Sequence, residues 1–242
     1  ERRKIKVMLS DIVFDKMFAY LEEMQIPVTL HNSDPATFWD LSTMTPYQIE
    51  KGWYCGDVAK KDELFEDVMT VLKRYPNLKI SLAHFGFTSD NIEEAYRLFE
   101  YKNTMLDVTP GGEQYNNITL NYEPWKKLIS ENANRFIFGT DTDCVIYDSE
   151  EKIERLKYRY NIIKRFFKTT DEYDNNNGPV KGVGLTKEQY DKILGENAYN
   201  LLGARKPIDL DYIKFSVSQL SSVVATEHDK QVLKDIKNHF IK

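Results

Sequence analysis

The fold is decided by a short apolar run that ends in a histidine, Leu78-Lys79-Ile80-Ser81-Leu82-Ala83-His84. A run of this length predicts a buried strand. Residues 62–75, just before it, repeat apolar side chains at helical spacing and end next to Pro76, which predicts a helix. A second helical segment follows at residues 90–99. A strand between two helices is the repeating unit of an α/β protein with a parallel sheet.

The same alternation extends along the chain in both directions. The expected strands are residues 5–9, 27–31, 78–84, 104–109 and 135–141. The expected helices lie near residues 12–24, 62–75, 90–99, 123–132, 150–168 and 186–202. Residues 32–61 form an unusually long connection, which is often functional, and residues 171–184 are predicted to be a flexible loop. We therefore expect one domain over residues 1–205 and a helical C-terminal extension over residues 206–242.

The composition excludes several classes of protein. The 242 residues are 41% hydrophobic and 29% charged with a net charge of −5, so no basic excess indicates nucleic acid as a partner. No apolar run approaches the ~20 residues of a membrane span. The two cysteines form neither a disulfide framework nor a cysteine-rich zinc cluster. Glycine-rich phosphate loops and nucleophile elbows are absent, and with no signal-peptide pattern we expect a cytoplasmic protein.

Polar side chains end four successive predicted strands, at His31, His84, Thr109 and Asp141. Parallel strands joined by crossover helices present their carboxyl ends on one face, and in a β/α barrel the catalytic residues gather there. Two imidazoles and a carboxylate suit a divalent metal, above all zinc. A bound metal would lower the pKa of water toward ~7, and a carboxylate beside it could take the proton.

Each of these residues also has a structural interpretation. A single histidine at a strand end is more often a hydrogen-bonded structural residue, and an aspartate after a strand is commonly a cap or turn. The argument depends on coincidence, because two of only four histidines end apolar strands in the same way. Asp107 could point into the site or be buried and hydrogen-bonded. Trp53 could cover a substrate pocket or hold the long connection in place.

Four stretches, in this order and spacing, resemble the amidohydrolase superfamily in its amidohydrolase-related branch. They are Pro27-Val28-Thr29-Leu30-His31, Leu82-Ala83-His84-Phe85-Gly86, Phe136-Ile137-Phe138-Gly139-Thr140-Asp141, and Ile193-Leu194-Gly195-Glu196-Asn197-Ala198 through Leu202-Gly203. The resemblance covers residues 1–205 and implies a metal-dependent (β/α)8 TIM barrel. It implies a hydrolase of cyclic amides or lactones, or a non-oxidative decarboxylase of aromatic acids.

The resemblance also implies roles for individual residues. His31 would be the metal ligand that ends the fifth barrel strand. His84, ending the sixth, would be a second ligand in a two-metal site or a substrate-polarising, acid–base residue in a one-metal site. Asp141, ending the eighth, would bind the metal and accept the proton of the attacking water. Asp107 and Thr109, ending the seventh, would touch substrate.

The sequence departs from this family at the first strand. The family's His-x-His pair has no counterpart, because no two histidines here are separated by one residue. If residues 5–9 are the fourth strand, strands one to three are missing, and we expect an incomplete barrel of about strands 4–8. An open doubly wound sheet would also fit this length, but it would leave the strand-end histidines unexplained.

The leading functional hypothesis is a metal-dependent hydrolase in which an activated water attacks a C–N or lactone bond of a small molecule. The alternatives are the decarboxylase on the same scaffold and a non-catalytic, barrel-derived binding protein. The expected partner is a small-molecule substrate, with neither nucleic acid nor membrane, and assembly into a homo-oligomer is left open.

Overall fold

The computed structural model describes residues 7–57, 59–111, 113–142, 150–175, 177–203 and 209–240. The chain divides into two compact units, Glu1–Gly203 and Ala204–Lys242. The domain boundary predicted between residues 205 and 206 lies outside the described residues.

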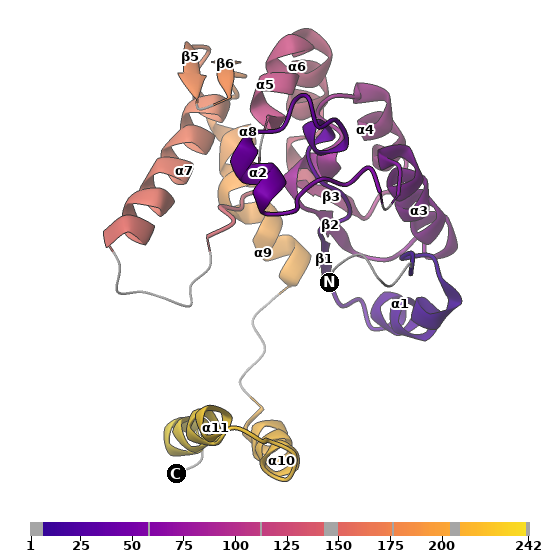
Figure 1. Ribbon diagram of the computed structural model, residues 1–242, viewed down its shortest axis with the longest axis vertical. Coiled ribbons are helices and arrows are strands. Elements are labelled where there is room, and N and C mark those ends of the chain that lie inside the picture. The colour runs from indigo at the N-terminus through magenta and orange to yellow at the C-terminus, as the bar shows by residue number, and fades with distance from the viewer. Residues whose placement is uncertain are drawn as a thin grey trace. The chain divides into compact units, whose positions relative to one another are not determined.

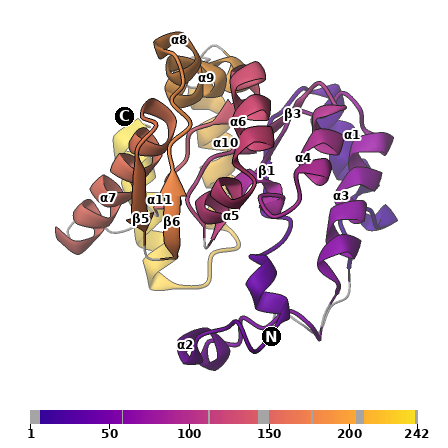
Figure 2. The ribbon, with the colours of Figure 1, turned by 90° about the horizontal axis from the view of Figure 1, so that it is seen from above.

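A four-stranded parallel sheet forms the centre of the first unit (Figures 1 and 2). Its strands lie in chain order and are β1 (Val28–Leu30), β2 (Ile80–Leu82), β3 (Thr104–Asp107) and β4 (Phe136–Ile137). Chain order without a reversal is the arrangement of successive barrel strands, whereas a doubly wound sheet reverses at a switch point. The parallel α/β class predicted from the sequence is therefore confirmed.

Helices flank this sheet and bury its side chains. They are α1 (Asp15–Glu23), α3 (Lys61–Arg74), α4 (Ile92–Phe99), α5 (Gln114–Leu120), α6 (Tyr122–Glu131), α7 (Glu150–Lys168), α8 (Lys187–Asp191) and α9 (Asn197–Leu202). The short helix α2 (Pro46–Glu50) belongs to the connection between β1 and α3 and buries no residue. Ile80, Leu82 and Leu106 on the strands are fully buried in one core with Val68 and Leu72 of α3. Each such side chain contributes about 1.5–3 kcal/mol by leaving water. The apolar faces that predicted the helices are thus the faces that cover the sheet.

The last helical segment, rather than another strand, borders β4. The helix predicted over residues 186–202 is interrupted between α8 and α9 by a π-helical turn, Lys192–Glu196. The interruption brings the carbonyl of Ile193 to the N–H of Phe138 at 3.0 Å. The side-chain amide of Asn197 donates to two backbone carbonyls beside β4, at 2.7 and 2.8 Å. These bonds fix the end of the unit to the sheet edge.

The first predicted strand is wrong in its described part. Ile5 and Lys6 lie outside the described residues, and residues 7–9 are not in a strand. The N–H groups of Leu9 and Ser10 donate instead to the buried carboxylate of Asp67, at 2.6 and 3.0 Å. A backbone N–H held by a carboxylate is not available for a ladder hydrogen bond. The described residues therefore give four parallel strands where five were predicted.

Residues 171–184 were predicted to be a flexible loop, and this is also wrong. They contain an antiparallel hairpin of β5 (Glu172–Asn175) and β6 (Gly178–Lys181). Val180 on β6 is buried in the core, and Gly178 at the turn has a φ of +116°, where glycine is favoured. The asparagine-rich composition predicted a loop, whereas the hairpin depends on one buried side chain, Val180, and on Gly178 at its turn.

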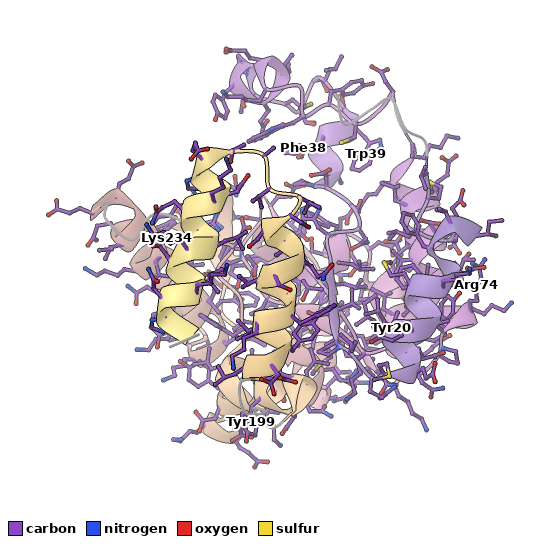
Figure 3. All side chains as sticks on the ribbon, turned by 90° about the horizontal axis from the view of Figure 1, so that it is seen from below. Tyr20, Phe38, Trp39, Arg74, Tyr199 and Lys234 are labelled. Atoms are coloured by element: carbon purple, nitrogen blue, oxygen red, sulfur yellow. The ribbon has the colours of Figure 1, made fainter. Side chains whose placement is uncertain are left out.

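The second unit is a helical hairpin, which confirms the helices predicted for this part of the chain. Its helices α10 (Leu210–Ser221) and α11 (Glu227–Phe240) pack against each other (Figure 3). Val217 and Leu233 are its buried large apolar side chains. Across both units, none of the described helices combines the length and the apolarity that crossing a membrane requires.

Candidate active site

The carboxyl ends of β1 and β2 bring two histidines together. His31 follows β1 and His84 lies two residues beyond β2, and these strands pair with Leu30 opposite Leu82. The two imidazole rings meet edge to face with their centroids 5.3 Å apart. Phe87 packs against both rings, at centroid distances of 5.0 and 5.1 Å. The sequence pattern of strand-end histidines therefore corresponds to one place on the molecule.

The backbone around His84 fixes the orientation of its ring. His84, Phe85, Gly86 and Phe87 all have a positive φ, which is uncommon for residues other than glycine. Nδ1 of His84 lies 3.3 Å from the carbonyl oxygen of Thr109. A carbonyl only accepts, so Nδ1 carries the hydrogen and Nε2 remains as an acceptor. Burial of the side chain lowers the pKa of His84, which favours the neutral imidazole that metals bind.

A carboxyl group and a hydroxyl lie beside this histidine at the end of β3. The Asp107 carboxylate accepts a hydrogen bond from the N–H of Thr109 at 2.6 Å, and burial raises the pKa of Asp107. Two glycines leave the necessary space. A Cβ on Gly139 would lie 2.3 Å from the side-chain oxygens of both residues, and one on Gly111 would lie 2.5 Å from Nδ1 of His84. The structure thus places Asp107 and Thr109, two of the three residues predicted to contact substrate, near His84.

Asp141 faces an arginine that the sequence interpretation missed. The φ of Asp141 is +50°, and its side chain is 55% exposed. Nη1 of Arg159, on α7, donates to the carbonyls of Thr140 and Asp141 at 2.5 and 2.6 Å and to Oδ2 of Asp141 at 3.0 Å. The Arg159 side chain is only 15% exposed. In the sequence, Arg159 is one of many charged residues in a predicted helix. Its position beside Asp141 becomes apparent only in the folded structure.

The histidine pair fits a divalent metal, while the described residues do not complete its coordination. A ligating histidine usually donates its second ring N–H to a carbonyl or carboxylate, as His84 does here. Among the side chains that the structure describes, no group of three or more histidines, cysteines, aspartates or glutamates is placed to hold a metal ion. Of the three predicted ligands, His31 and His84 are brought together, and Asp141 is paired with Arg159.

Trp53 packs within the long connection between β1 and α3. Its ring stacks on Phe38 at 5.6 Å and meets Tyr47 edge-on at 5.7 Å. The N–H of Cys55 donates to the carbonyl of Phe38 at 2.8 Å, which closes the same segment on itself. These contacts match the interpretation in which Trp53 holds the loop, and its contact with substrate stays a prediction.

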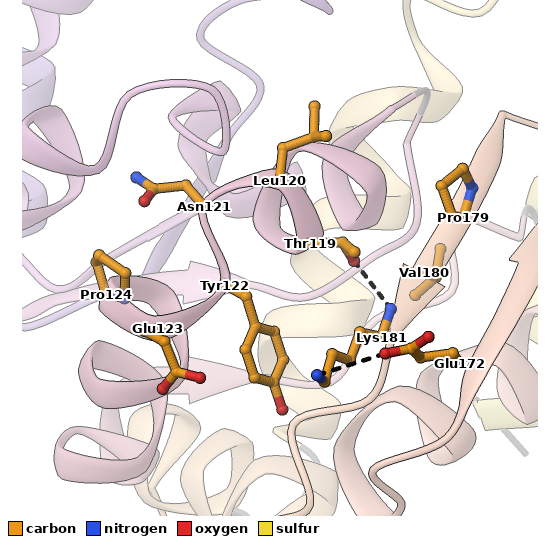
Figure 4. A pocket seen from close by; sticks show the side chains of 10 residues that line it. All are labelled: Thr119, Leu120, Asn121, Tyr122, Glu123, Pro124, Glu172, Pro179, Val180 and Lys181. Carbon is orange, nitrogen blue, oxygen red and sulfur yellow. Dashed lines mark hydrogen bonds and ion pairs between the residues drawn. The ribbon is translucent and has the colours of Figure 1, made fainter.

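A small pocket of about 140 Å³ adjoins the strand-end residues, and Gly111 and Arg159 are part of its wall. A larger pocket of about 580 Å³ lies where the α5–α6 junction meets the β5–β6 hairpin (Figure 4). Tyr122 and Lys181 line the larger pocket, but none of the predicted site residues does. None of them lines the smaller pocket either, although its lining residue Pro110 directly follows Thr109 and Gly111 lies against His84.

Comparison with known families agrees with this arrangement. A family model described as amidohydrolase matches residues 6–204, which include the whole parallel sheet and every strand-end residue considered above. The chain belongs to the amidohydrolase family. Amidohydrolases generally bind divalent metals. Comparison with curated proteins gave no match.

This amidohydrolase is also similar to solved structures. A TIM-barrel protein from Bordetella bronchiseptica is 16% identical, with 81% of this chain and 52% of that chain covered and a TM-score of 0.44. A Staphylococcus aureus protein described as an amidohydrolase is 17% identical, with 84% and 62% covered and a TM-score of 0.45. A dihydroxybenzoic acid decarboxylase from Polaromonas, with bound manganese and 2-nitroresorcinol, is 13% identical, with 83% and 57% covered and a TM-score of 0.42. The chain thus spans between 52% and 62% of the length of these structures.

Proposed function

We propose that this amidohydrolase is part of a metal-dependent hydrolase in which an activated water attacks a C–N or lactone bond of a small molecule. The observation that carries the proposal is the pairing of His31 with His84 at the carboxyl end of the sheet. Membership of the family supports the same class of chemistry. Because the chain spans little more than half of the solved structures it resembles, the activity of the whole protein is itself part of this proposal.

The two histidines would hold the metal, which we propose to be zinc. When bound, a divalent metal supplies a Lewis acid that lowers the pKa of water toward ~7. His84 contributes a neutral ring, because its burial disfavours the imidazolium form. The carbonyl of Thr109 keeps the hydrogen on Nδ1, so Nε2 is the nitrogen available to a ligand. His31, which is exposed, offers the second imidazole.

The carboxyl groups at the same edge would move the proton. Asp141 would accept it from the attacking water and serve as a further ligand. Its carboxylate is paired with Arg159, so it has to exchange this partner to reach the histidine pair. Asp107 lies beside His84, and because burial raises its pKa it holds a proton more readily than an exposed aspartate does. With Thr109 it would contact the substrate.

The test measures metal content and turnover of lactones and cyclic amides by the full-length protein. His31→Ala and His84→Ala should each lose bound metal and turnover. His228→Ala is the matched control, because His228 is an exposed histidine on the second unit, and it should keep both. Full metal content and full turnover in either strand-end variant would show that the proposed site is wrong.

The alternatives give different results in the same experiment. A decarboxylase would release CO2 from aromatic carboxylates and leave lactones intact. A non-catalytic binding protein would purify without metal and act on neither class. The second alternative has a specific observation in its favour, namely that the described residues alone do not complete a metal site.

A further inference from the structure

We propose that the larger pocket is a separate binding site of this protein, and that its ligand is a small zwitterion, an α-amino acid with a large apolar side chain. The pocket lies where the α5–α6 junction meets the β5–β6 hairpin and has a volume of about 580 Å³ (Figure 4). Binding sites for small molecules hold roughly 300–1,000 Å³. None of the strand-end residues considered above lines it, so the inference is independent of the proposed hydrolysis.

The wall of the pocket carries charges of both signs close together. Nζ of Lys181, on β6, lies 3.4 Å from Oε1 of Glu172, on β5. Glu123, in the first turn of α6, adds a second carboxylate to the lining. A ligand complementary to this wall carries a carboxylate for the lysine and an ammonium for the glutamates. In an α-amino acid a single carbon separates these two groups, so the molecule matches two opposite charges that lie this close together.

The ion pair between Lys181 and Glu172 can exchange with such a ligand. Its distance of 3.4 Å is longer than that of a strong charge-assisted hydrogen bond, about 2.7–2.9 Å. The two side chains are 38% and 76% exposed, and an ion pair exposed in this way contributes little to stability. A zwitterion that binds between them gives each charge a new partner, so neither side chain is left unpaired.

Tyr122 fixes the position of the lysine in the pocket. The hydroxyl of Tyr122 donates to the carbonyl of Gly182 at 2.8 Å, which holds the ring in place. Nζ of Lys181 lies 4.8 Å from the centroid of this ring, and Figure 4 shows the ammonium between the ring and Glu172. A cation at such a distance over a tyrosine ring is attracted to it. The ring therefore holds the ammonium where the carboxylate of the ligand would bind.

Hydrogen bonds join the two sides of the pocket, so the site exists before a ligand binds. The N–H of Lys181 donates to Oγ1 of Thr119, on α5, at 2.9 Å. The side-chain amide of Asn116 donates to the carbonyl of Pro179, on β6, at 3.1 Å. Val180, between these two β6 residues, is buried in the core. An ordered site loses less conformational freedom on binding than a mobile one.

The remaining lining is apolar and would contact the side chain of the amino acid. Leu120, the last residue of α5, is 83% exposed, the largest exposed fraction among the large apolar side chains that the structure describes. Pro124 and Pro179 also line the pocket. An apolar group of the ligand that covers Leu120 removes this surface from water, which favours binding. Phenylalanine and leucine should therefore bind more tightly than glycine.

The test is calorimetric titration of the full-length protein with three related compounds. They are phenylalanine, phenylalaninamide, which keeps only the ammonium, and N-acetylphenylalanine, which keeps only the carboxylate. The wild type should bind phenylalanine about tenfold more tightly than either analogue, because each analogue lacks one charged contact. Lys181→Gln should weaken phenylalanine binding about tenfold and leave phenylalaninamide unchanged. The double variant Glu123→Gln/Glu172→Gln should weaken phenylalanine binding and leave N-acetylphenylalanine no weaker.

Lys192→Gln is the matched control. Lys192 also forms an ion pair with a glutamate, Glu188, and its side chain is 35% exposed, close to the 38% of Lys181, but it does not line the pocket. This variant should bind phenylalanine like the wild type. Leu120→Ser removes the apolar wall without removing a charge, and it should weaken phenylalanine binding. The double variant and Leu120→Ser decide the question even if Lys181→Gln does not fold.

Equal binding of the three compounds by the wild type would overturn the inference, and so would the absence of phenylalanine binding. Phenylalanine binding that Lys181→Gln, the double variant and Leu120→Ser all leave unchanged would also overturn it. Binding that His84→Ala abolishes would place the ligand at the strand ends instead of in this pocket. Since no turnover is measured, none of these results depends on whether the protein is a hydrolase.

Discussion

A Cβ atom on Gly139 would lie 2.3 Å from Oδ2 of Asp107, closer than side chains approach one another. Asp107 is the last residue of β3, and Gly139 lies two residues beyond the end of β4. A Cβ on Gly139 would also lie 2.3 Å from the hydroxyl oxygen of Thr109, so the absence of a side chain leaves room for that hydroxyl as well. The polar cluster beside the histidines therefore depends on a glycine that bears no functional group.

Gly139→Ala should destabilise the fold by about 1–3 kcal/mol, the usual cost of adding a methyl group to a packed site. Equilibrium unfolding in urea measures this change. Gly195→Ala is the control, because a Cβ at Gly195 meets nothing within 4 Å. In a helical turn that control should be neutral or stabilising by up to about 1 kcal/mol. If the Gly139→Ala and Gly195→Ala variants have the same free energy of unfolding, the close contact of Gly139 with Asp107 and Thr109 is wrong.

His84 should make the protein more stable as the pH rises. Burial lowers the pKa of His84 in the folded state below the value of about 6.5 that an unfolded imidazole has. Between these two pKa values the unfolded chain binds more protons, so the free energy of unfolding falls as the pH falls. The contribution is fully present above about pH 6.5. The stability difference between wild type and His84→Gln should therefore shrink from about pH 8 to about pH 5.

Two features make that measurement specific. Burial raises the pKa of Asp107, which gives the opposite pH dependence, and comparing wild type with His84→Gln largely cancels it. His228→Gln replaces an exposed histidine on the second unit and is measured alongside. A stability difference for His84→Gln that stays constant from about pH 8 to about pH 5 would mean that the folded protein does not hold this ring neutral.

Sequence periodicity was sufficient for the parallel sheet. A strand buried on both faces is a short apolar run, and the run at residues 78–84 contains β2 (Ile80–Leu82). The rule that parallel strands end on one face then placed His31 beside His84. Both inferences use only neighbouring residues and one general property of sheets.

The missed features depend on contacts between residues far apart in the chain. Arg159 reaches Asp141 across 18 residues, and no local pattern distinguishes it from the other charges of α7. The helix is interrupted by a π-helical turn at Lys192–Glu196, where the carbonyl of Ile193 accepts a hydrogen bond from the N–H of Phe138, 55 residues earlier in the chain. The sequence thus predicted that His31 and His84 lie together, but it did not predict that Asp141, a proposed metal ligand, is hydrogen-bonded to Arg159.

Arg135 is a half-buried cation whose guanidinium holds three backbone carbonyls, an arrangement called the clamp below. Its guanidinium donates at 2.6, 3.2 and 2.6 Å to three carbonyl oxygens, those of Thr104, Phe99 and Tyr101. Burial lowers the pKa of Arg135 to about 10, which still leaves it charged at neutral pH. Arg135→Ala should cost about 2–5 kcal/mol, because partly buried carbonyls lose a charged donor.

Arg97→Ala is the matched control for this loss, measured in the same urea titration. Arg97 pairs with Glu66 at 2.6 Å, but its side chain is 43% exposed. An exposed ion pair contributes at most about 1 kcal/mol. A cost for Arg135→Ala no greater than that for Arg97→Ala would contradict the clamp.

Residues 7–9, predicted as a strand, instead lead into a turn that is hydrogen-bonded to Asp67. Removing the Asp67 carboxylate should destabilise that turn. Its carboxylate accepts the N–H groups of Leu9 and Ser10 at 2.6 and 3.0 Å. Asp67→Ala should cost about 2–3 kcal/mol, since two hydrogen bonds to a charged group are lost. Amide hydrogen exchange at Leu9 and Ser10 should speed up by more than exchange in the buried strand β2, because the loss is local.

Asp62→Ala is the control, because it also removes a negative charge from α3 but breaks no hydrogen bond to Leu9 or Ser10. Asp62 is exposed in the first turn of α3, where an acidic residue contributes about 0.3–1 kcal/mol through the helix dipole. It should leave the exchange of Leu9 and Ser10 unchanged. If Asp67→Ala also leaves these two amides as protected as in the wild type, the carboxylate is not what diverts residues 7–9 from the sheet.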